Sequence, residues 1–214
     1  MRRMLREYGV FLREVRNSFH TTGALIPSGR FLARAMTSEL VKKNGCTRIL
    51  EAGAGTGALT REILQHVGTE DHLDLVEYSH PFVTLLGERF EKEERFRRVA
   101  DQTRILHMAL QDLPGEGVYD YVISGLPLNN FSPQLVQDVF DCFRRLIVPG
   151  GVLTFFEYLW VRGIKRFVAP RSEVDRLTRV GTLLAEHLKH FEFRREKVWM
   201  NCPPALVHHL RLGR

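Results

Sequence analysis

The sequence predicts an α/β fold: a mostly parallel, seven-stranded sheet with helices on both faces and a C-terminal antiparallel hairpin. Three observations indicate this class. From residue 48 onward, short β-rich apolar runs alternate with amphipathic helical patterns, which is typical of parallel strands joined by helices. The first of these runs breaks into three closely spaced glycines and then resumes at helical spacing. Two strand-like runs near the end are separated only by the turn "NCPP".

The individual elements follow from these patterns in order. The strand-like runs cover residues 48–52, 72–78, 104–108, 119–124, 152–158, 192–200 and 205–212. The helical patterns cover residues 57–67, 81–96, 133–147 and 172–190. The segment Pro149-Gly150-Gly151 predicts a turn that feeds the fifth strand. A chain of 214 residues is long enough for one domain of this class.

The composition limits the classes of partner and the cellular setting that we expect. The 31 lysines and arginines exceed the 25 acidic residues and give a net charge of +6, which suits RNA or an acidic membrane surface. Three scattered cysteines without CxxC spacing indicate neither a disulfide framework nor a metal site, and we expect a reducing cytoplasm. Since no apolar run approaches about 18 residues, we expect the protein to lie on a membrane without crossing it.

The glycine segment "EAGAGTG" ends a strand and opens a helix, where glycines allow a tight turn and close approach of a ligand to the backbone. Its third glycine comes one position too early for the GxGxxG dinucleotide fingerprint, which argues against NAD or FAD. Glu77 ends the next strand, 20 residues beyond Gly57, and its carboxylate can accept hydrogen bonds from both hydroxyls of a ribose.

This pattern of an acid, alternating glycines and a second acid resembles the S-adenosylmethionine site of Rossmann-like class I methyltransferases. The resemblance implies that the three glycines pass the methionine portion, Glu51 lies near its amino group and Glu77 binds the ribose. The cofactor-binding residues that it implies are Glu51, Gly53, Gly55, Gly57, Glu77, Tyr78, Ala109, Leu110, Ser124, Gly125, Thr22 and Gly23. Many such enzymes carry an acid after the third strand to contact the adenine, but this chain has Ala109 there. Asp112 or a backbone carbonyl is the alternative contact.

The segment "SGLPLNNF" after the fourth strand should select the substrate. Methyltransferases that act on nucleic acid bases often have an Asn or Asp at its start and an aromatic residue that stacks on the base. Here Gly125 and Leu128 take those positions, so the base-reading parts are missing. Leu126 and Pro127 are the candidates for substrate contact. An alternative is that "GLP" is only a rigid strand exit.

Together with "TTGALIPSGRFLARAM", "EAGAGTGALT" and "PGGVLTFFEY", this segment resembles the bacterial phospholipid N-methyltransferases, which methylate phosphatidylethanolamine, and their relatives that act on ornithine lipids. The resemblance runs from about residue 21 to 158 and implies that Thr22, Gly23, Ala24, Pro27 and Ser28 fold over the cofactor. Ser28 and Arg30 become candidate substrate contacts, Arg30 through a lipid phosphate, although an exposed arginine without a partner is the alternative. We expect residues 21–214 to form the methyltransferase domain.

Residues 1–20 predict a separate amphipathic helix that associates with the membrane. Its apolar residues recur every three or four positions, and its arginines occupy the other flanks. The residues expected at the membrane are Arg2, Arg3, Arg6, Phe11, Arg13 and Arg16. A terminal helix packed on the body of the protein is the alternative.

The function expected from this resemblance is transfer of the sulfonium methyl group of S-adenosylmethionine to the neutral primary amine of phosphatidylethanolamine or ornithine lipid, without a metal. Tyr158 is a candidate for holding the cationic headgroup over its ring, and Glu157 is a candidate base. The expected place is the inner, cytoplasmic face of the membrane, with no nucleic acid partner. An rRNA adenine N-methyltransferase and a non-catalytic membrane-binding module are the alternatives. The number of methyl groups added and the oligomeric state stay open.

Overall fold

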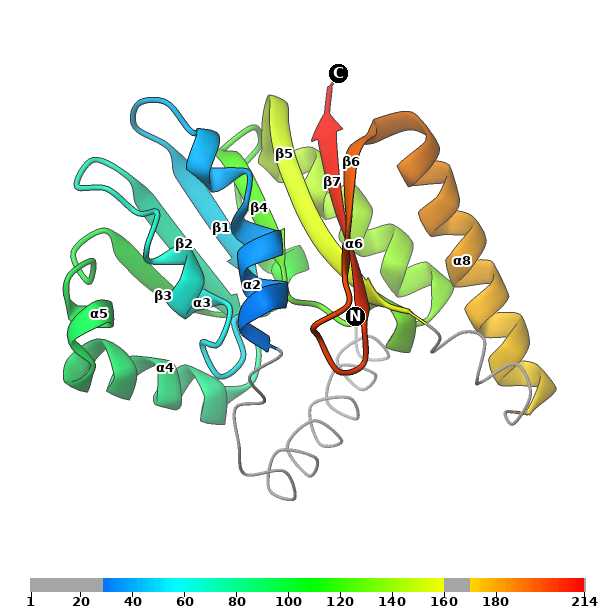
Figure 1. The fold of residues 1–214 in the computed structure, drawn as a ribbon, viewed down its shortest axis with the longest axis horizontal. Coiled ribbons are helices and arrows are strands. Elements are labelled where there is room, and N and C mark those ends of the chain that lie inside the picture. Colours follow the sequence, from blue (N-terminus) through cyan, green and yellow to red (C-terminus); the bar gives the residue numbers. More distant parts are fainter. Residues whose placement is uncertain (1–28, 160–169, 214) are drawn as a thin grey trace.

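The fold is that of a computed structural model, which describes residues 29–159 and 170–213. Seven strands form one sheet in the order β3-β2-β1-β4-β5-β7-β6 (Figure 1). The strands are β1 (Arg48–Ala52), β2 (His72–Glu77), β3 (Thr103–His107), β4 (Tyr119–Ser124), β5 (Ile147–Tyr158), β6 (Glu192–Val198) and β7 (Ala205–Leu212). Strands β1 to β5 are parallel, whereas β7 is antiparallel to both β5 and β6. The predicted fold class and its C-terminal hairpin are confirmed.

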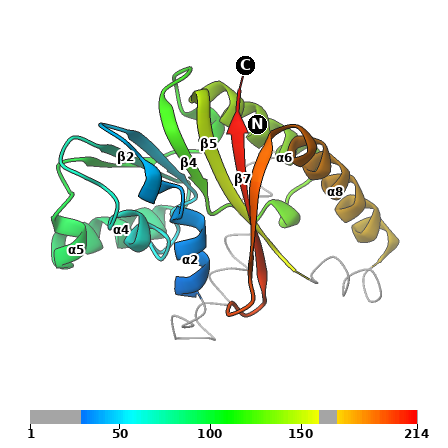
Figure 2. The ribbon, with the colours of Figure 1, turned by 45° about the horizontal axis from the view of Figure 1, so that its top comes forward.

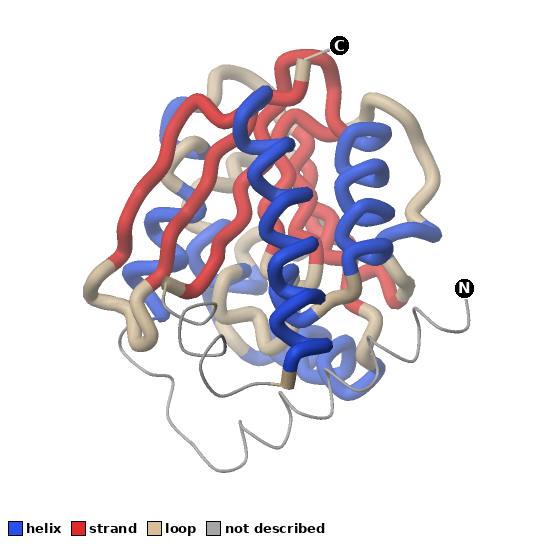
Figure 3. The backbone as a smooth tube through the Cα atoms, turned by 90° about the vertical axis from the view of Figure 1, so that its right-hand side faces the viewer, coloured by secondary structure: helices blue, strands red, loops and turns tan. Residues whose placement is uncertain are grey.

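Helices cover both faces of the sheet (Figure 2). The α-helices are α2 (Gly29–Thr37), α3 (Thr60–Ile63), α4 (His80–Lys92), α5 (Glu94–Arg97), α6 (Pro133–Leu146) and α8 (Arg171–Phe191). Short 3₁₀ turns are η1 (Leu40–Lys42), η2 (Leu110–Asp112) and η3 (Leu128–Asn130). One apolar cluster joins the sheet to α6 and α8, and a second joins the other face to α2, α3, α4 and α5. Helix α8 lies at the hairpin end of the molecule and faces the viewer in Figure 3.

Three predicted elements were wrong in more than their last one or two residues. The helix predicted over 57–67 is only α3, and it cannot begin at Gly57, because the φ of +77° there lies outside the right-handed helical region. The helix predicted over 81–96 divides into α4 and α5 at Glu93, whose backbone is extended. The predicted turn before the fifth strand lies inside β5: the pairing of β4 with β5 jumps from Ile147 to Val152, so the proline and glycines bulge out of a strand that has already begun.

The parallel strands share one direction, so their carboxyl ends meet at one edge of the sheet, here called the carboxyl edge, and their starts form the opposite amino edge. Both Val198 and Tyr158 pair with Ala205. The turn between β6 and β7 therefore lies at the carboxyl edge, beside the end of β5. None of the helices in the described part of the chain combines the length and apolar character that crossing a bilayer requires.

Candidate functional site

The glycine turn wraps the carboxyl end of β1. Gly53, Gly55 and Gly57 have φ values of +78°, +55° and +77°, a region that costs other residues about 1–2 kcal/mol. Backbone hydrogen bonds fix the turn: the N–H of Gly53 donates to the carbonyl of Val76 at 2.9 Å, and that of Gly57 donates to Ala54 at 2.9 Å. The sequence pattern thus folds into the tight strand-to-helix turn that it predicts.

The three glycines have different reasons to be glycine. A Cβ at Gly53 would lie 2.5 Å from Cδ2 of Leu126, and one at Gly57 would lie 2.9 Å from Cδ2 of Leu86. A Cβ at Gly55 would meet nothing within 4 Å. Gly53 and Gly57 therefore allow close packing within the protein, whereas Gly55 leaves open space at the carboxyl edge, where a ligand can approach the backbone.

Glu77 joins the glycine turn to the next loop. Its side chain is almost fully buried at the end of β2, and its Oε2 and Oε1 accept hydrogen bonds from the N–H groups of Gly55 at 2.8 Å and Ser79 at 2.7 Å. Burial raises the pKa of this carboxyl, and the two N–H donors oppose that effect. The two oxygens of a carboxylate together offer about four lone-pair sites. The carboxylate can therefore accept a ribose hydroxyl while it holds the loops.

Glu51 lies beneath the turn and is completely buried. The hydroxyl of Thr60 donates to its Oε2 at 2.7 Å, whereas Oε1 has no hydrogen-bond partner within the described ranges. Burial raises the pKa of Glu51 to about 8. A buried, unsatisfied carboxyl oxygen below an open glycine backbone fits a ligand that carries a positive charge, as the methionine portion of S-adenosylmethionine does.

The ends of β2 and β3 form the next part of the edge. Tyr78 follows β2, and its carbonyl lies 3.2 Å from Nε2 of His107, the last residue of β3. The ring of His80 meets that of His107 edge-on, with 5.4 Å between their centroids. The predicted site did not include these two histidines, although His107 ends a strand in the same way as Glu77.

The predicted residues after β3 lie on or beside η2. Ala109 precedes this turn with an extended backbone, and Asp112 is exposed at its end. The side chain of Leu110 is buried in the core, so only its backbone is available to a ligand.

The exit of β4 crosses beneath the glycine turn. A Cβ at Gly125 would lie 2.8 Å from the carbonyl oxygen of Gly53, and the Oγ of buried Ser124 accepts the N–H of Leu126 at 3.3 Å. The side chains of Leu126 and Leu128 are both buried in the core, and Pro127 is half-buried. The segment therefore packs closely against the glycine turn, with the side chains of both leucines in the core.

Helix α8 fixes the loop that follows. The guanidinium of Arg176 donates to the carbonyl of Asn129 at 2.9 Å and also to that of Phe131. The same guanidinium is held by Glu173 through two bonds of 2.8 Å. The β4 exit thus has support from both the glycine turn and a distant helix.

Tyr158 and Glu157 end β5. Tyr158 is 37% exposed, its ring meets Phe156 edge-on at 5.1 Å, and partial burial raises the pKa of its hydroxyl. Glu157 is only 13% exposed, and its Oε1 lies 3.8 Å from Nε2 of buried His208. The other ring nitrogen of His208 lies 2.5 Å from Oε1 of Glu192. The candidate base is therefore one end of a buried chain of ionisable groups.

Several predicted residues lie outside the described residues. They are Thr22, Gly23, Ala24, Pro27, Ser28 and the N-terminal helix with Arg2, Arg3, Arg6, Phe11, Arg13 and Arg16. Arg30 is described: it lies exposed on α2, and its guanidinium carbon is 5.0 Å from the centroid of the Phe31 ring.

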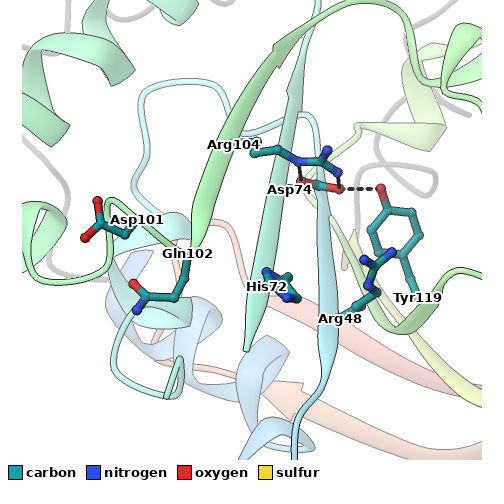
Figure 4. A pocket seen from close by; sticks show the side chains of 7 residues that line it. All are labelled: Arg48, His72, Asp74, Asp101, Gln102, Arg104 and Tyr119. Carbon is teal, nitrogen blue, oxygen red and sulfur yellow. Dashed lines mark hydrogen bonds and ion pairs between the residues drawn. The ribbon is translucent and has the colours of Figure 1, made fainter. Parts of the chain in front are cut away.

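A separate hollow of about 240 Å³ lies at the amino edge, lined by residues that include Arg48 and His72 (Figure 4). Arg104 donates two hydrogen bonds of 2.7 Å to Asp74, and the hydroxyl of Tyr119 donates a third at 2.6 Å. The residues that line the hollow lie at or near the starts of β1, β2, β3 and β4, at the opposite end of the sheet from the glycine turn. We assign this cluster to the stability of the sheet, because it satisfies a buried carboxylate.

Comparison with known proteins agrees with the geometry. Residues 49–151 match the methyltransferase domain family. An ornithine lipid N-methyltransferase from Singulisphaera acidiphila is 28% identical over 166 residues, which cover 76% of this chain and 85% of that protein. The hybrid PKS-NRPS synthetase lepA of Aspergillus flavus is 31% identical over 146 residues, but this chain spans only 4% of its length.

A solved structure has the same fold. The 1,6-didemethyltoxoflavin-N1-methyltransferase of Burkholderia thailandensis, solved with bound 1,6-didemethyltoxoflavin and S-adenosylhomocysteine, superposes with a TM-score of 0.64 at 19% identity. The superposition covers 98% of this chain and 90% of that one. The chain described here therefore carries a class I methyltransferase domain whose cofactor is S-adenosylmethionine.

Proposed function

We propose that this enzyme transfers methyl groups from S-adenosylmethionine to the primary amine of a membrane aminolipid, either ornithine lipid or phosphatidylethanolamine. The observation that carries the proposal is the extent of the match to the ornithine lipid enzyme, which spans 85% of that protein. By contrast, the polyketide synthetase matches over 4% of its length, which is what a shared domain alone produces.

The β4 exit supports an amine rather than a nucleic acid base as the acceptor. Gly125 provides no side-chain hydrogen-bond acceptor for a base, and Leu128, at the position of the expected stacking aromatic, is buried in the core. An aliphatic amine needs neither feature. The intact glycine turn, with Glu51 and Glu77 beneath it, supports catalysis over a binding module that has lost its cofactor.

The chemistry at this edge is alignment, exclusion of water and removal of one proton. A sulfonium methyl is already activated, so the protein has to orient the amine in line with it. The ammonium must lose a proton first. In our proposal Glu157 receives it, with His208 3.8 Å away as the next group in the chain. The ring of Tyr158, exposed at the end of β5, provides a face for the cationic product.

The substrate places the enzyme at the inner face of the membrane. The net charge of +6 favours an anionic lipid surface. The arginine-rich segment 1–20 is proposed to bind that surface. Arg30, exposed on α2, is proposed to meet the lipid phosphate.

The decisive experiment offers radiolabelled S-adenosylmethionine to the enzyme with vesicles that contain ornithine lipid, phosphatidylethanolamine or neither. Structured RNA and a β-ketoacyl thioester are offered in parallel, and the products are separated by chromatography. We expect label in an aminolipid, and none with the Glu77→Ala variant. Label in RNA or in the thioester alone would overturn the proposal.

A further inference from the structure

Exposed apolar side chains gather at the carboxyl edge. The large apolar side chains exposed in the described part of the chain are Val41, Tyr158, Phe193, Trp199 and Met200. The first and third lie at the amino edge, before β1 and at the start of β6. The other three lie at the carboxyl edge, where the cofactor turn opens. Trp199 and Met200 are the most exposed of these three, at 58% and 68%.

These two side chains form the tip of the turn between β6 and β7, which we call the hairpin tip (residues 199–200). The turn is held firmly: buried Asn201 donates to the carbonyl of Pro203 at 2.7 Å, and the N–H of Leu159 donates to that of Pro204 at 2.7 Å. In Figures 1 and 2 the turn projects beyond the sheet beside the first turn of α2. An ordered backbone therefore presents a tryptophan and a methionine outward.

The charges around the tip match an anionic lipid surface. The ammonium of Lys197 lies 5.9 Å from the centroid of the Trp199 ring. Arg30 is exposed on the adjacent first turn of α2, and the whole chain carries +6. Tryptophan flanked by basic residues is the composition of protein segments that lie at the headgroup level of a bilayer.

We propose that the hairpin tip inserts into the headgroup region of an anionic bilayer and turns the carboxyl edge toward the membrane. The inference rests on the proposed function for its choice of a lipid surface over a protein partner. It goes further by naming the contact: Trp199 and Met200 enter the bilayer, while Lys197 and Arg30 meet lipid phosphates. This orientation brings Tyr158 and the glycine turn to the level of the amine, so a lipid reaches the site without leaving its leaflet.

The test follows Trp199 directly. The chain has two tryptophans, so Trp160→Phe leaves Trp199 as the sole reporter. The reporter protein is mixed with vesicles of equal parts phosphatidylcholine and phosphatidylglycerol, which offer no primary amine. We expect a blue shift of the emission and quenching by brominated acyl chains. Binding without quenching of Trp199 would overturn the inference, as would a blue shift that depends on protein concentration in the absence of vesicles.

A second measurement separates insertion from general attraction. Replacing both tip residues, Trp199→Ser with Met200→Ser, should weaken vesicle binding about tenfold and leave S-adenosylmethionine affinity unchanged, which also shows that the variant is folded. The matched control is Phe193→Ser, because Phe193 is 43% exposed on the same hairpin but lies at the amino edge. Equal loss in both variants, or loss in neither, would contradict the proposal.

The two proposals fail separately in these experiments. Vesicle binding is measured on lipids that cannot be methylated, so it does not depend on activity. Quenching of Trp199 without label in any aminolipid would refute the substrate and keep the docking surface. Label in an aminolipid without quenching of Trp199 would support the proposed substrate and refute the docking surface.

Discussion

The carboxylate of Glu77 accepts a hydrogen bond from the backbone N–H of Gly55, with 2.8 Å between Oε2 and the nitrogen. Gly55 is the one glycine of the turn whose added Cβ would meet no protein atom within 4 Å. The residue expected to bind the ribose thus also fixes the part of the turn that faces the ligand. Because Glu77 holds Ser79 as well, it sets two cofactor loops at once and orders them before the cofactor arrives.

Shortening Glu77 should therefore damage cofactor binding. In Glu77→Asp the carboxylate lies one methylene further back and cannot reach both N–H groups. Hydrogen bonds to a charged group contribute about 1.5–3 kcal/mol, so we expect S-adenosylmethionine affinity to fall about 10- to 100-fold in titration calorimetry. Glu88→Gln is the control, because Glu88 pairs with Lys92 on the exposed face of α4. Unchanged affinity in the aspartate variant would remove Glu77 from the cofactor site.

Gly55→Ala, compared with a control glycine, should show whether a side chain at this position blocks the cofactor or only strains the backbone. The methyl group projects into the space assigned to the ligand, and such overpacking costs about 1–3 kcal/mol, or roughly 5- to 150-fold in affinity. Gly117→Ala is the matched control: Gly117 has a φ of +57° against +55° at Gly55, its Cβ also meets nothing, and it lies in an exposed loop. Both variants should lose about 1 kcal/mol of stability. Equal cofactor affinity in the two would mean that Gly55 does not face the ligand.

The sequence predicted strands better than helices, for a local reason. The predicted bounds of β1, β4 and β7 agree with the structure, because their apolar runs end at turn residues. The residue at which α3 begins could not be predicted from such a signal. Gly57 looks like a helix residue in the pattern, but it has a left-handed φ, and an added Cβ would meet Leu86, which is distant in sequence.

The candidate site also has parts that the sequence predicted and parts that it did not. The acids and glycines were found because each follows a strand, and parallel strands place such residues at one edge. The pairing of Glu157 with His208 was not predictable, since it depends on the register of β5 and β7, which are far apart in the chain. The inward direction of Leu126 was equally hidden, because it depends on the absence of a Cβ at Gly53.

Tyr119→Phe tests whether the hollow of Figure 4 is structural. The hydroxyl of Tyr119 donates to Asp74, whose side chain is 5% exposed. Burial raises the pKa of Tyr119, and the hydrogen bond to this carboxylate raises it further. Loss of one donor to a buried charge should lower the free energy of unfolding by about 1–3 kcal/mol in urea titrations. Cofactor affinity should not change, because the cluster lies at the amino edge.

Tyr121→Phe is the control for that variant. Tyr121 lies two residues further along β4, and its hydroxyl makes no hydrogen bond within residues 29–159 and 170–213. Its loss should change the free energy of unfolding by less than about 0.5 kcal/mol. A large loss of cofactor affinity in Tyr119→Phe would instead mean that the amino-edge cluster affects the cofactor site at the carboxyl edge, and that its role is not only structural.

Glu51 carries a proton that links the stability of the fold to pH. Its pKa is about 8 in the folded protein, because of burial, against 4.5 for an unperturbed glutamate. Between these values the folded state holds a proton that the unfolded state has released. The free energy of unfolding therefore falls as the pH rises through this window, by up to about 1.4 kcal/mol per pH unit. Glu51→Gln should remove that slope, whereas the control Glu62→Gln, at an ion-paired glutamate on α3, should keep it.

The same proton should appear when the cofactor binds. The positive charges of S-adenosylmethionine favour the carboxylate of Glu51, so binding at pH 7 should release a proton. Calorimetry in buffers of different ionisation enthalpy measures that release, because the observed heat then varies with the buffer. The Glu51→Gln variant should bind more weakly and show a heat that is independent of the buffer. A buffer-independent heat in the unmodified enzyme would mean that Glu51 keeps its protonation state when the cofactor binds, and would contradict this prediction.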